Sequence, residues 1–509
     1  MGVLSHQLES FDSPVPKLPV AVLAPSLILL LTLSYTIYRG VYNVFFHPLR
    51  HYPGPKLWAM TGIPYGATFL SGQGHRKILD LHLKYGPAVR IAPDTLSYSH
   101  PDAVKEIRGH RKHGQAEHGK DPNRSWANRD NVIGADRFNH TRYRRSLANG
   151  FSHQAMIDQQ PIIKGYVDKL IDRLKEVSAG GTQKLDIVRW FNYATFDIIG
   201  DLSFGEPFGC LEKSDYHPWV SLVFNSVKNI AFQSVIKKYH NYSWILNRLL
   251  MPKDLAPKYA EHRQLSAAKL HKRLSADTDR PDFVASMSTK RGSLDELTPE
   301  EMSSHASLLI IAGSETTATA LSAAAYYLAL NPRVMAKLNE EVRTTFSTEE
   351  EIDLLSVQGL TYMHAVLDEA MRLFPAVPGG QPRMAAKGGD TIIGQFVPEG
   401  TLMEVWQWVA HHNPEYFTLP EEFIPERWLG DPRFANDQTD VFQPFSYGPR
   451  NCIGKNLAYA EMRLMLARLV WNFDLKMTEE SRGWAERSQI YLLWEKGAID
   501  VYLTPRNME

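Results

Sequence analysis

The longest uninterrupted run of apolar positions lies near the start of the chain. Residues 18–38 carry no charged side chain, and residues 27–33 are almost wholly aliphatic. A run of about 20 apolar residues is enough for one helix to cross a bilayer. The run is longer than the apolar core of a signal peptide, and no clear small-residue cleavage site follows it. The pattern therefore predicts an uncleaved transmembrane anchor over residues 18–38.

The charges on either side of this run predict its orientation. Lys17 is the sole lysine or arginine before the anchor, whereas Arg39, Arg50 and Lys56 follow it closely. Positively charged residues near a membrane span favour its cytosolic side. We therefore expect residues 1–17 to form a short lumenal tail and the large C-terminal part to lie in the cytosol.

A proline-rich stretch separates the anchor from the body of the protein. Pro48, Pro53 and Pro55 fix the backbone angle φ within residues 39–56, which predicts a stiff hinge. Beyond it, the chain shows no repeat, no low-complexity tract and no further linker. Residues 57–509 are therefore predicted to form one large domain.

Apolar positions at helical spacing dominate that body. The longest such pattern runs from about Glu301 to Leu330, before Pro332. At 1.5 Å per residue, a helix of this length would measure about 45 Å and could cross a whole domain. Strand-like patterns are short and occur near residues 88–93, 391–397 and 499–503. The predicted fold class is mainly α with minor β.

Composition excludes several classes of function. The chain has 56 basic and 56 acidic residues and no long basic block, so nucleic-acid binding has no electrostatic support. Cys210 and Cys452 are its only cysteines, which excludes a disulfide framework, and no paired spacing predicts a zinc site. We interpret Cys210 as a packed structural thiol.

Cys452 lies in a glycine-framed loop just before an amphipathic helical pattern. The thiolate is the form that binds metals, and the N–H groups and dipole at a helix N-terminus favour it. Gly448 and Gly454 allow backbone angles and close approaches that a Cβ would forbid. This arrangement predicts a thiolate offered to a haem iron. The alternative is a buried structural cysteine beside a surface turn.

Two further residues of the loop fit that chemistry. Phe445 can cover the sulfur, and Arg450 can reach an acidic haem propionate. Thiolate ligation pushes electron density onto the iron and favours cleavage of the O–O bond. Because these residue types stand together within residues 445–454, the haem-ligand interpretation is favoured over an isolated structural thiol.

The long helical pattern carries a candidate proton-delivery site at Gly313, Glu315 and Thr316. Activation of dioxygen at iron needs protons, which a hydroxyl and a carboxylate near one helical turn can supply. The absent side chain at Gly313 would leave a gap for oxygen and water. The alternative is a small-residue helix packed in a core, with Thr316 hydrogen-bonded to a carbonyl group of its own helix.

The segment around Cys452 resembles the haem-binding signature of the cytochrome P450 superfamily. The resemblance extends from the proline-rich hinge to residues 494–497, with four motifs in the same order. It implies the cytochrome P450 fold, a helix-rich single domain with small β-sheets, preceded by one N-terminal transmembrane helix. Residues 57–509 would then be a haem-thiolate catalytic domain. The implied cofactor is haem b, with electrons from NADPH through NADPH-cytochrome P450 reductase and with cytochrome b5 as a further partner.

The resemblance also assigns an ionic cluster. Glu369 and Arg372 are three positions apart on one helical pattern, and Arg427 follows later in the chain. In the family, residues at these positions form a buried triad behind the haem, with an architectural role. Without the resemblance, the first two would be interpreted as a solvated surface pair.

Cations for the haem propionates are implied in the same way. Besides Arg450, the resemblance points to Arg383, Arg144 and His140. Many relatives have tryptophan where this chain has His140, which can still donate a hydrogen bond. The alternative for the segment of Arg144 and His140 is a solvated basic helix face.

The implied activity is a monooxygenase that inserts one oxygen atom from O2 into an apolar small molecule, by hydroxylation, epoxidation or a related oxidation. The hinge and residues 197–208 look most like fungal microsomal members that tailor secondary metabolites, including the trichothecene hydroxylase group. The substrate class would be a polyketide, terpenoid or alkaloid. The implied location is the endoplasmic reticulum membrane, with a single span. The reductase would dock on the Cys452 side, near Lys455.

Two other functions fit the same signature. A haem-thiolate isomerase or dehydratase would need no electron supply, and the intact pair of Glu315 and Thr316 argues against it. A membrane-anchored haem protein without catalytic activity would keep the fold but would not need Thr316. His411 and His412 could in principle ligate iron, but neither lies in a cradle like that of Cys452.

Overall fold

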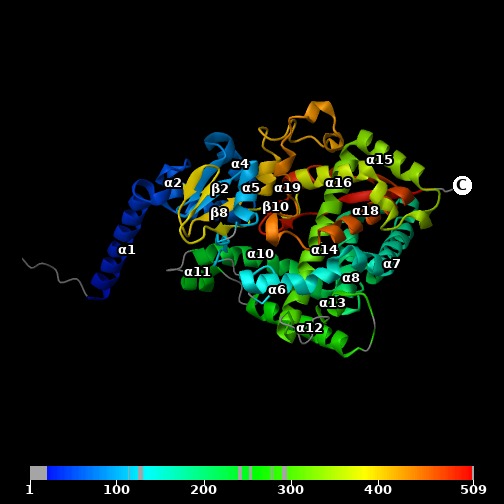
Figure 1. Cartoon of the computed structure of the whole chain (residues 1–509), viewed down its shortest axis with the longest axis horizontal. Coiled ribbons are helices and arrows are strands. Elements are labelled where there is room, and N and C mark those ends of the chain that lie inside the picture. The colour runs from blue at the N-terminus through cyan, green and yellow to red at the C-terminus, as the bar shows by residue number, and fades with distance from the viewer. Residues whose placement is uncertain are drawn as a thin grey trace, which may run out of the picture.

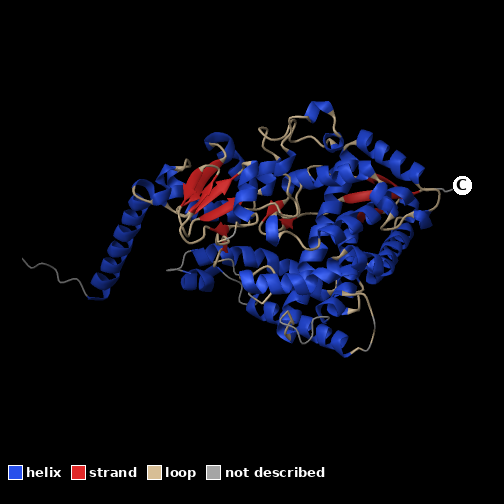
Figure 2. Cartoon of the chain, in the orientation of Figure 1, coloured by secondary structure: helices blue, strands red, loops and turns tan. Residues whose placement is uncertain are grey.

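Helices make up most of the body of the protein, and short strands form four small sheets among them (Figure 1, Figure 2). The computed structural model describes residues 20–112, 114–123, 130–238, 243–250, 255–276, 278, 280–288 and 295–506. Helix α1 projects from one end of the body (Figure 1). The predicted fold class, mainly α with minor β, is confirmed.

The α-helices range from single turns to one helix that crosses the whole body. In chain order they are α1 (Val20–Phe45), α2 (Lys56–Met60), α3 (Ile63–Leu70), α4 (Gly74–Tyr85), α5 (Pro101–Arg108), α6 (Arg137–Ala148), α7 (His153–Val177), α8 (Ile187–Phe204), α9 (Cys210–Lys213), α10 (Pro218–Lys238), α11 (Ser243–Leu250), α12 (Leu255–Ser275), α13 (Phe283–Ser288), α14 (Pro299–Leu330), α15 (Pro332–Thr345), α16 (Thr361–Leu373), α17 (Gln407–His411), α18 (Lys455–Asn472) and α19 (Trp484–Arg487).

The largest sheet has the strand order β1-β2-β8-β5-β3, in which β2 and β8 are parallel and the other neighbours antiparallel. A second sheet has the order β4-β12-β9, and two hairpins pair β6 with β7 and β10 with β11. The strands are β1 (Ala88–Ala92), β2 (Thr95–Tyr98), β3 (Gly119–Lys120), β4 (Lys184–Asp186), β5 (Arg383–Met384), β6 (Asp390–Ile392), β7 (Gln395–Val397), β8 (Leu402–Val405), β9 (Phe473–Met477), β10 (Gln489–Ile490), β11 (Trp494–Glu495) and β12 (Asp500–Pro505).

Helix α1 continues past residue 38, the predicted end of the anchor, and ends at Phe45. The stretch from Leu23 to Phe45 is long and apolar enough to span a membrane, and 6% of it is buried. The predicted hinge over residues 39–56 therefore begins as helix. The physical reason is that no proline lies between residue 38 and Pro48, which starts a short 3-10 helix. The predicted lumenal tail, residues 1–17, lies outside the described residues.

Helix α14 is the central helix of the body, and its bounds agree with the prediction. The Thr298 side chain accepts a hydrogen bond from the backbone N–H of Glu301, whose carboxylate accepts one from the N–H of Thr298. This capping box and Pro299 at the first helical position fix the N-terminus. The helix is also apolar enough to span a membrane, but it is 72% buried, which marks it as a core helix.

The strand predicted over residues 391–397 is a hairpin of two strands, β6 and β7. Ile393 and Gly394 between them have φ angles of 42° and 76°, and this left-handed pair reverses the chain. The strands predicted near residues 88–93 and 499–503 are present as β1 and β12.

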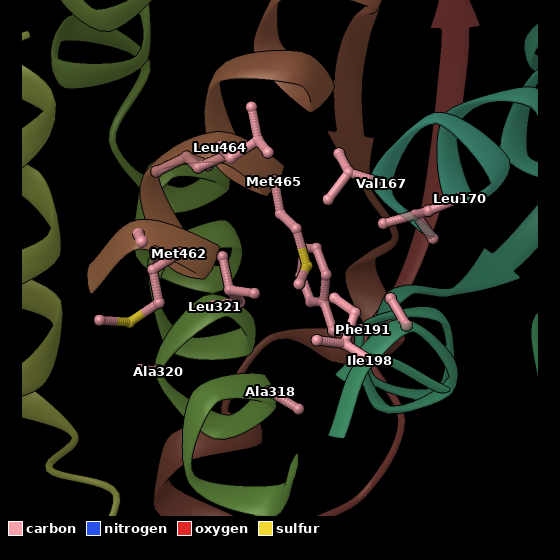
Figure 3. Close-up of a cluster of buried hydrophobic side chains, with 14 of the residues drawn as sticks. Val167, Leu170, Phe191, Ile198, Ala318, Ala320, Leu321, Met462, Leu464 and Met465 are labelled. Carbon is pink, nitrogen blue, oxygen red and sulfur yellow. The ribbon is translucent and has the colours of Figure 1, made fainter. Parts of the chain in front are cut away.

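The main hydrophobic core holds α14 against α18, the helix that follows Cys452. Figure 3 shows Leu321 of α14, Met465 of α18 and Phe191 of α8 converging in this core. All three side chains are fully buried. Close packing of this kind resists displacement. The two elements that carry the predicted motifs are therefore held in a fixed relation.

Candidate functional site

A cavity of about 310 Å³ lies between α14 and the loop that carries Cys452. Its α14 wall includes Leu309, Ala312 and Ala320, so that side is mainly apolar. Of the residues predicted for the site, those that line the cavity are Cys452, Phe445, Arg450, Gly454, Arg383, Arg144, His140, Gly313 and Thr316. Residues from distant parts of the chain thus meet at one site.

The Cys452 side chain is accessible at the cavity wall. Its backbone N–H donates to the Phe445 carbonyl at 2.8 Å, and α18 begins three residues later at Lys455. Although its side chain is exposed to the cavity, Cys452 lies deep in the protein, and this desolvation raises the pKa of its thiol, while the Gly454 N–H, Arg144 and Lys455 act in the opposite direction. The predicted effect of the helix start is present, but the protein groups alone do not overcome the cost of burial.

The two loop positions occupied by Gly448 and Gly454 differ in whether the structure requires a glycine there. Gly448 has a φ angle of 77°, and a Cβ there would lie 2.0 Å from the backbone oxygen of Arg108. Gly454 has a φ angle of −85°, and a Cβ there would meet nothing closer than 3.7 Å, a carbon of Phe151. The expectation that a Cβ would be forbidden is therefore confirmed for Gly448. For Gly454 the expectation stays a prediction, because the chain's own atoms neither require nor exclude a Cβ there.

Positive charge exceeds negative charge at one end of the cavity. Arg383 is 7% exposed, and its Nη1 atom has no hydrogen-bond partner among the described residues. Burial, then Arg108 and Arg450, lower the pKa of Arg383 to about 9, while Glu117 raises it. Burial and the same three arginines also hold the pKa of Lys120 well below its usual range. Arg383 has no ion pair among the described residues, so this end of the cavity fits a ligand that carries carboxylates.

Arg450 itself has partners within the chain. Its guanidinium pairs with the Glu117 carboxylate, and its Nη1 donates to the Ala135 carbonyl at 2.8 Å. Arg144 donates to the Asn451 carbonyl at 2.6 Å and lies beside the Cys452 loop. His140 is buried, and burial followed by Arg450 and Arg144 lowers its pKa to about 4. His140 is therefore a neutral side chain at neutral pH.

Glu315 and Thr316 are adjacent in α14, but their side chains make different contacts. The Thr316 hydroxyl lines the cavity and donates to the Ala312 carbonyl at 2.6 Å. Since its hydrogen is used in that bond, its oxygen presents lone pairs to the cavity. Glu315 does not line the cavity, because its carboxylate forms a buried ion pair with Lys496.

The gap expected at Gly313 is partly filled. Gly313 lines the cavity, but a Cβ there would lie 2.6 Å from the terminal carbon of Ile199. The side chain of α8 therefore occupies the place that the glycine leaves open. This glycine allows α8 and α14 to pack closely beside the cavity.

The predicted ionic triad is assembled and fully buried. Arg372 donates twice to the Glu369 carboxylate, each time at 2.9 Å, and Arg427 Nε donates to Glu369 Oε1 at 3.0 Å. Trp428 Nε1 also donates to this carboxylate, at 2.9 Å. Asp437 pairs with the far side of Arg427. Two arginines thus face two carboxylates, and the cluster is electrically balanced.

The other candidate ligands lie elsewhere. The ring nitrogen Nδ1 of His411 is 3.1 Å from the Arg372 carbonyl, and that of His412 is 2.8 Å from the Trp408 carbonyl. Neither histidine lines the cavity. Cys210 is fully buried, burial raises its pKa to about 12, and its backbone N–H donates to Asp197. The interpretation of Cys210 as a structural thiol fits this environment.

Several residues of the site carried no sequence signal. Glu117, Lys120 and Asp437 meet their partners through the fold, and no local spacing marks them. Glu461 of α18 lines the cavity at 2% exposure, and burial raises the pKa of its carboxyl to about 8. An acidic residue amid the apolar positions of a helix is the one hint that the sequence offered for Glu461.

A second hollow, of about 780 Å³, lies on the outer side of the Cys452 loop. It shares Phe445 and Asn451 with the cavity, so a thin wall separates the two. Lys455 and Arg463 line this outer face, and the Lys455 side chain is exposed. A cationic surface is therefore available close to Cys452.

Comparison with known proteins gives one family. The model of the family described as Cytochrome P450 matches residues 52–500. The chain is similar to a trichothecene C-15 hydroxylase of Fusarium sporotrichioides, with 55% identity over 93% of this chain and 96% of that protein. It is also similar to an averantin hydroxylase of Dothistroma septosporum, with 44% identity over 94% of this chain and 90% of that protein. A cytochrome P450 monooxygenase, astJ, of Aspergillus oryzae is 42% identical over 94% of this chain and 96% of its own length.

Proposed function

This chain belongs to the cytochrome P450 family, and from that premise we propose that Cys452 is the axial ligand of its haem iron. The protein is a monooxygenase with haem b as cofactor and with electrons from NADPH through a reductase. In the overall reaction, two electrons and two protons convert O2 to one oxygen atom in the product and one water. The observation that supports the ligand is a cysteine at the wall of a cavity that three arginines also line, one of which, Arg383, has an unpartnered donor atom.

The cations at the cavity end would bind the two carboxylates of haem. Arg383 has a free donor atom, and Lys120 lies in the same positive field. Arg450, Arg144 and His140 line the adjacent wall. Because buried cations without anions are costly, a doubly anionic group would relieve their repulsion as it binds. Phe445 would cover the sulfur of Cys452 and limit access of water to it.

When bound, the haem supplies the binding and reductive cleavage of dioxygen, favoured by an electron-donating thiolate. The chain's own residues supply protons and exclude bulk water. Thr316 would accept a hydrogen bond at its Oγ atom from a water in the cavity, because its hydroxyl hydrogen is held by Ala312. Glu315 would supply protons to that position after it parts from Lys496. Both residues therefore act on the substrate side of the site.

The cluster of Glu369, Arg372 and Arg427 would have an architectural role. It joins α16 to the segment at residues 418–437, which precedes the Cys452 loop. Its groups are buried and mutually satisfied, so a missing member would leave a charge unpaired at a cost of roughly 3 to 5 kcal/mol. The cluster thus holds the loop from behind.

We propose a trichothecene as the substrate and hydroxylation as the reaction. The support is the 55% identity to a trichothecene C-15 hydroxylase along nearly the whole chain. The apolar wall formed by Leu309, Ala312 and Ala320 suits such a small apolar molecule. The averantin hydroxylase, at 44% identity, makes averantin the comparison compound.

The proposed location is the endoplasmic reticulum membrane, with one span. The exposed apolar helix α1 supports an anchor, and the charges that flank it support a lumenal tail at residues 1–17. In this proposal the anchor of residues 18–38 continues as helix into the segment of residues 39–56, and residues 57–509 form the cytosolic haem-thiolate domain. NADPH-cytochrome P450 reductase, and cytochrome b5 as a further donor, would dock at the cationic outer face near Lys455.

Reconstitution of the full chain with a P450 reductase tests this function. We expect conversion of a trichothecene lacking the 15-hydroxyl group, with one O2 and one NADPH consumed per product, and a substrate-induced spin shift of the haem. Averantin is expected to give a weaker shift. Product formed without NADPH and reductase would contradict the monooxygenase reaction. Conversion of averantin in preference to the trichothecene would contradict the proposed substrate.

A further inference from the structure

The cavity is roofed by a short irregular segment, residues 131–135, from which Val132 and Ile133 line the cavity wall. The segment has an internal turn, because the side-chain oxygen of Asn131 accepts from the backbone N–H groups of Ile133 and Gly134, each at 3.2 Å. An Asn side chain that bonds the backbone ahead of it shapes a turn but does not fix its place on the protein. Something else must therefore hold the roof segment in position.

One end of the roof segment is tied to α14 through His305. The backbone N–H of Val132 donates to His305 Nε2 at 3.1 Å. The other ring nitrogen, Nδ1, lies 2.7 Å from the carbonyl of Glu301. A carbonyl can only accept, so Nδ1 carries the hydrogen and Nε2 has the lone pair that Val132 needs. The neighbouring Ser304 receives a second contact, from the Asn131 amide at 3.3 Å.

His305 is itself held rigidly between α14 and α6. Its side chain is fully buried, and its ring meets the ring of Tyr143 edge to face with centroids 4.8 Å apart. The Tyr143 hydroxyl donates to Glu301 at 2.7 Å, and Arg142 pairs with the same carboxylate. The imidazole therefore has little freedom to turn, and it transmits the position of α14 to Val132.

The other end of the roof segment is tied to the loop of Cys452. The carbonyl of Ala135 accepts from Arg450 Nη1 at 2.8 Å. The segment thus spans from α14 to the loop, with Val132 and Ile133 between the two attachments. If the His305 attachment were lost, the Ala135 attachment and the contact of Asn131 with Ser304 would remain. The backbone of Val132 would then have lost its own bond to α14 and could move away from the cavity.

We propose that His305 is a positioning residue that fixes Val132 and Ile133 over the cavity and so limits the poses in which a ligand can bind there. This inference rests on one part of the proposed function, namely that the cavity holds haem and a substrate. The competing role for His305 is simple core packing, which a ring of similar size would satisfy.

The contact does not depend on pH near neutrality. Burial, the largest cause, lowers the pKa of His305 to about 4, while the carbonyl and carboxylate of Glu301 raise it and Arg142 lowers it. Tyr143, the other titratable group against the ring, has a pKa raised by burial and by Glu301 and stays neutral. His305 therefore keeps its lone pair for Val132 throughout the neutral range.

Two substitutions separate positioning from packing. His305→Phe keeps the ring against Tyr143 but removes both hydrogen bonds, whereas His305→Gln keeps an acceptor near the place of Nε2. The probe is 4-phenylimidazole, which ligates haem iron and adds bulk in the cavity, with imidazole as the small reference ligand. In His305→Phe, the loss of the neutral hydrogen bond from Val132 should weaken 4-phenylimidazole binding by about three- to tenfold. Imidazole binding should stay within about twofold, and His305→Gln should restore most of the loss.

A double-mutant cycle shows whether His305 acts through Val132. The single substitution Val132→Ala should weaken the binding of 4-phenylimidazole. Adding His305→Phe to that variant should then cause almost no further loss of affinity. Fully additive effects of the two substitutions, or equal affinities in wild type and His305→Phe, would overturn the proposal.

Amide hydrogen exchange gives a readout that needs no ligand. In the full-length protein, the Val132 amide should exchange about tenfold or more faster in His305→Phe than in wild type, while amides of α14 are unchanged. Unchanged exchange at Val132 would overturn the proposal even if ligand affinity fell. If the wild-type protein bound neither imidazole nor 4-phenylimidazole, the result would instead contradict the proposed haem site itself.

Discussion

The ammonium group of Lys496 and the carboxylate of Glu315 form a buried ion pair beside the cavity, with side chains 4% and 7% exposed. The second carboxylate oxygen of Glu315 has no hydrogen-bond partner among the described residues. Lys496 follows the short strand β11, so the pair ties the C-terminal segment to the centre of α14. The ion pair keeps the Glu315 side chain in place, while its second oxygen is left able to accept a hydrogen bond.

Breaking this pair should destabilise the protein. Lys496→Met would leave the Glu315 carboxylate buried without its cation, at a cost of roughly 3 to 5 kcal/mol. Urea unfolding of the detergent-solubilised protein measures this loss. The double variant Lys496→Met with Glu315→Gln should recover most of it, because no charge is left unpaired. Removal of the exposed cation Arg433, which pairs with Asp431, is the control and should leave the stability almost unchanged.

Thr316→Ala should separate electron use from product formation. Without the hydroxyl oxygen in the cavity, protons reach dioxygen in the wrong order, and peroxide is released instead of product. The yield of product per NADPH should fall by about tenfold, with a matching rise in hydrogen peroxide. Ser322→Ala is a matched control, since Ser322 makes the same kind of back bond in α14, to Ala318 at 2.6 Å, but does not line the cavity. Equal yields in wild type and Thr316→Ala would contradict a role of Thr316 in proton delivery and would show that it only packs in the helix.

Arg383→Gln should have opposite effects on the haem-free and haem-loaded protein. Removing one buried cation from a positive cluster lowers repulsion, so the haem-free protein should become more stable. The loaded protein loses a partner for a haem carboxylate, and transfer of haem to an acceptor protein should become about tenfold faster. Slower haem transfer, or a less stable haem-free protein, would show that Arg383 serves the fold and not the ligand.

Glu461 should give the protein a stability that depends on pH. Burial raises the pKa of its carboxyl to about 8, above the value of 4.5 expected in the unfolded chain. Its contribution is therefore fully present below about pH 4.5 and declines as the pH rises towards about 8, since only the unfolded chain releases the proton in that window. Glu461→Gln should be more stable than wild type at pH 8, by up to a few kcal/mol, and indistinguishable near pH 4. A difference that is the same at both pH values would contradict this assignment.

Local signals predicted the parts of the fold that depend on neighbouring residues. The bounds of α14 could be predicted because Pro332 stops the helix and the apolar pattern runs unbroken up to it. The end of α1 could not, because the prediction placed it before the first charge, Arg39, whereas the helix continues past that charge to Phe45, shortly before Pro48. The hairpin of β6 and β7 was missed because Ile393, a residue that seldom adopts positive φ, shares its turn with Gly394.

The residues of the site also divide into those that lie in short motifs and those that only the fold brings together. The Cys452 loop and the pair of Glu369 and Arg372 lie within short motifs. Spacing placed the pair on one face of a helix, but its burial was implied by the family resemblance and not by the spacing. Contacts such as Lys496 with Glu315 join residues 181 positions apart, and no sequence period encodes them. The steric need at Gly448 comes from the backbone of Arg108, a residue distant in sequence, so residue type alone could not show which atom a Cβ would meet.

The central claim is that Cys452 holds the haem iron as a thiolate, and the spectrum of the reduced protein with carbon monoxide tests it most directly. Wild type should show the red-shifted Soret band of a thiolate-ligated complex, and Cys452→Ala should lose that band. The buried Cys210→Ala is the matched control and should retain it, because Cys210 lies outside the cavity. A Cys452→Ala protein that keeps the red-shifted band would contradict the assignment.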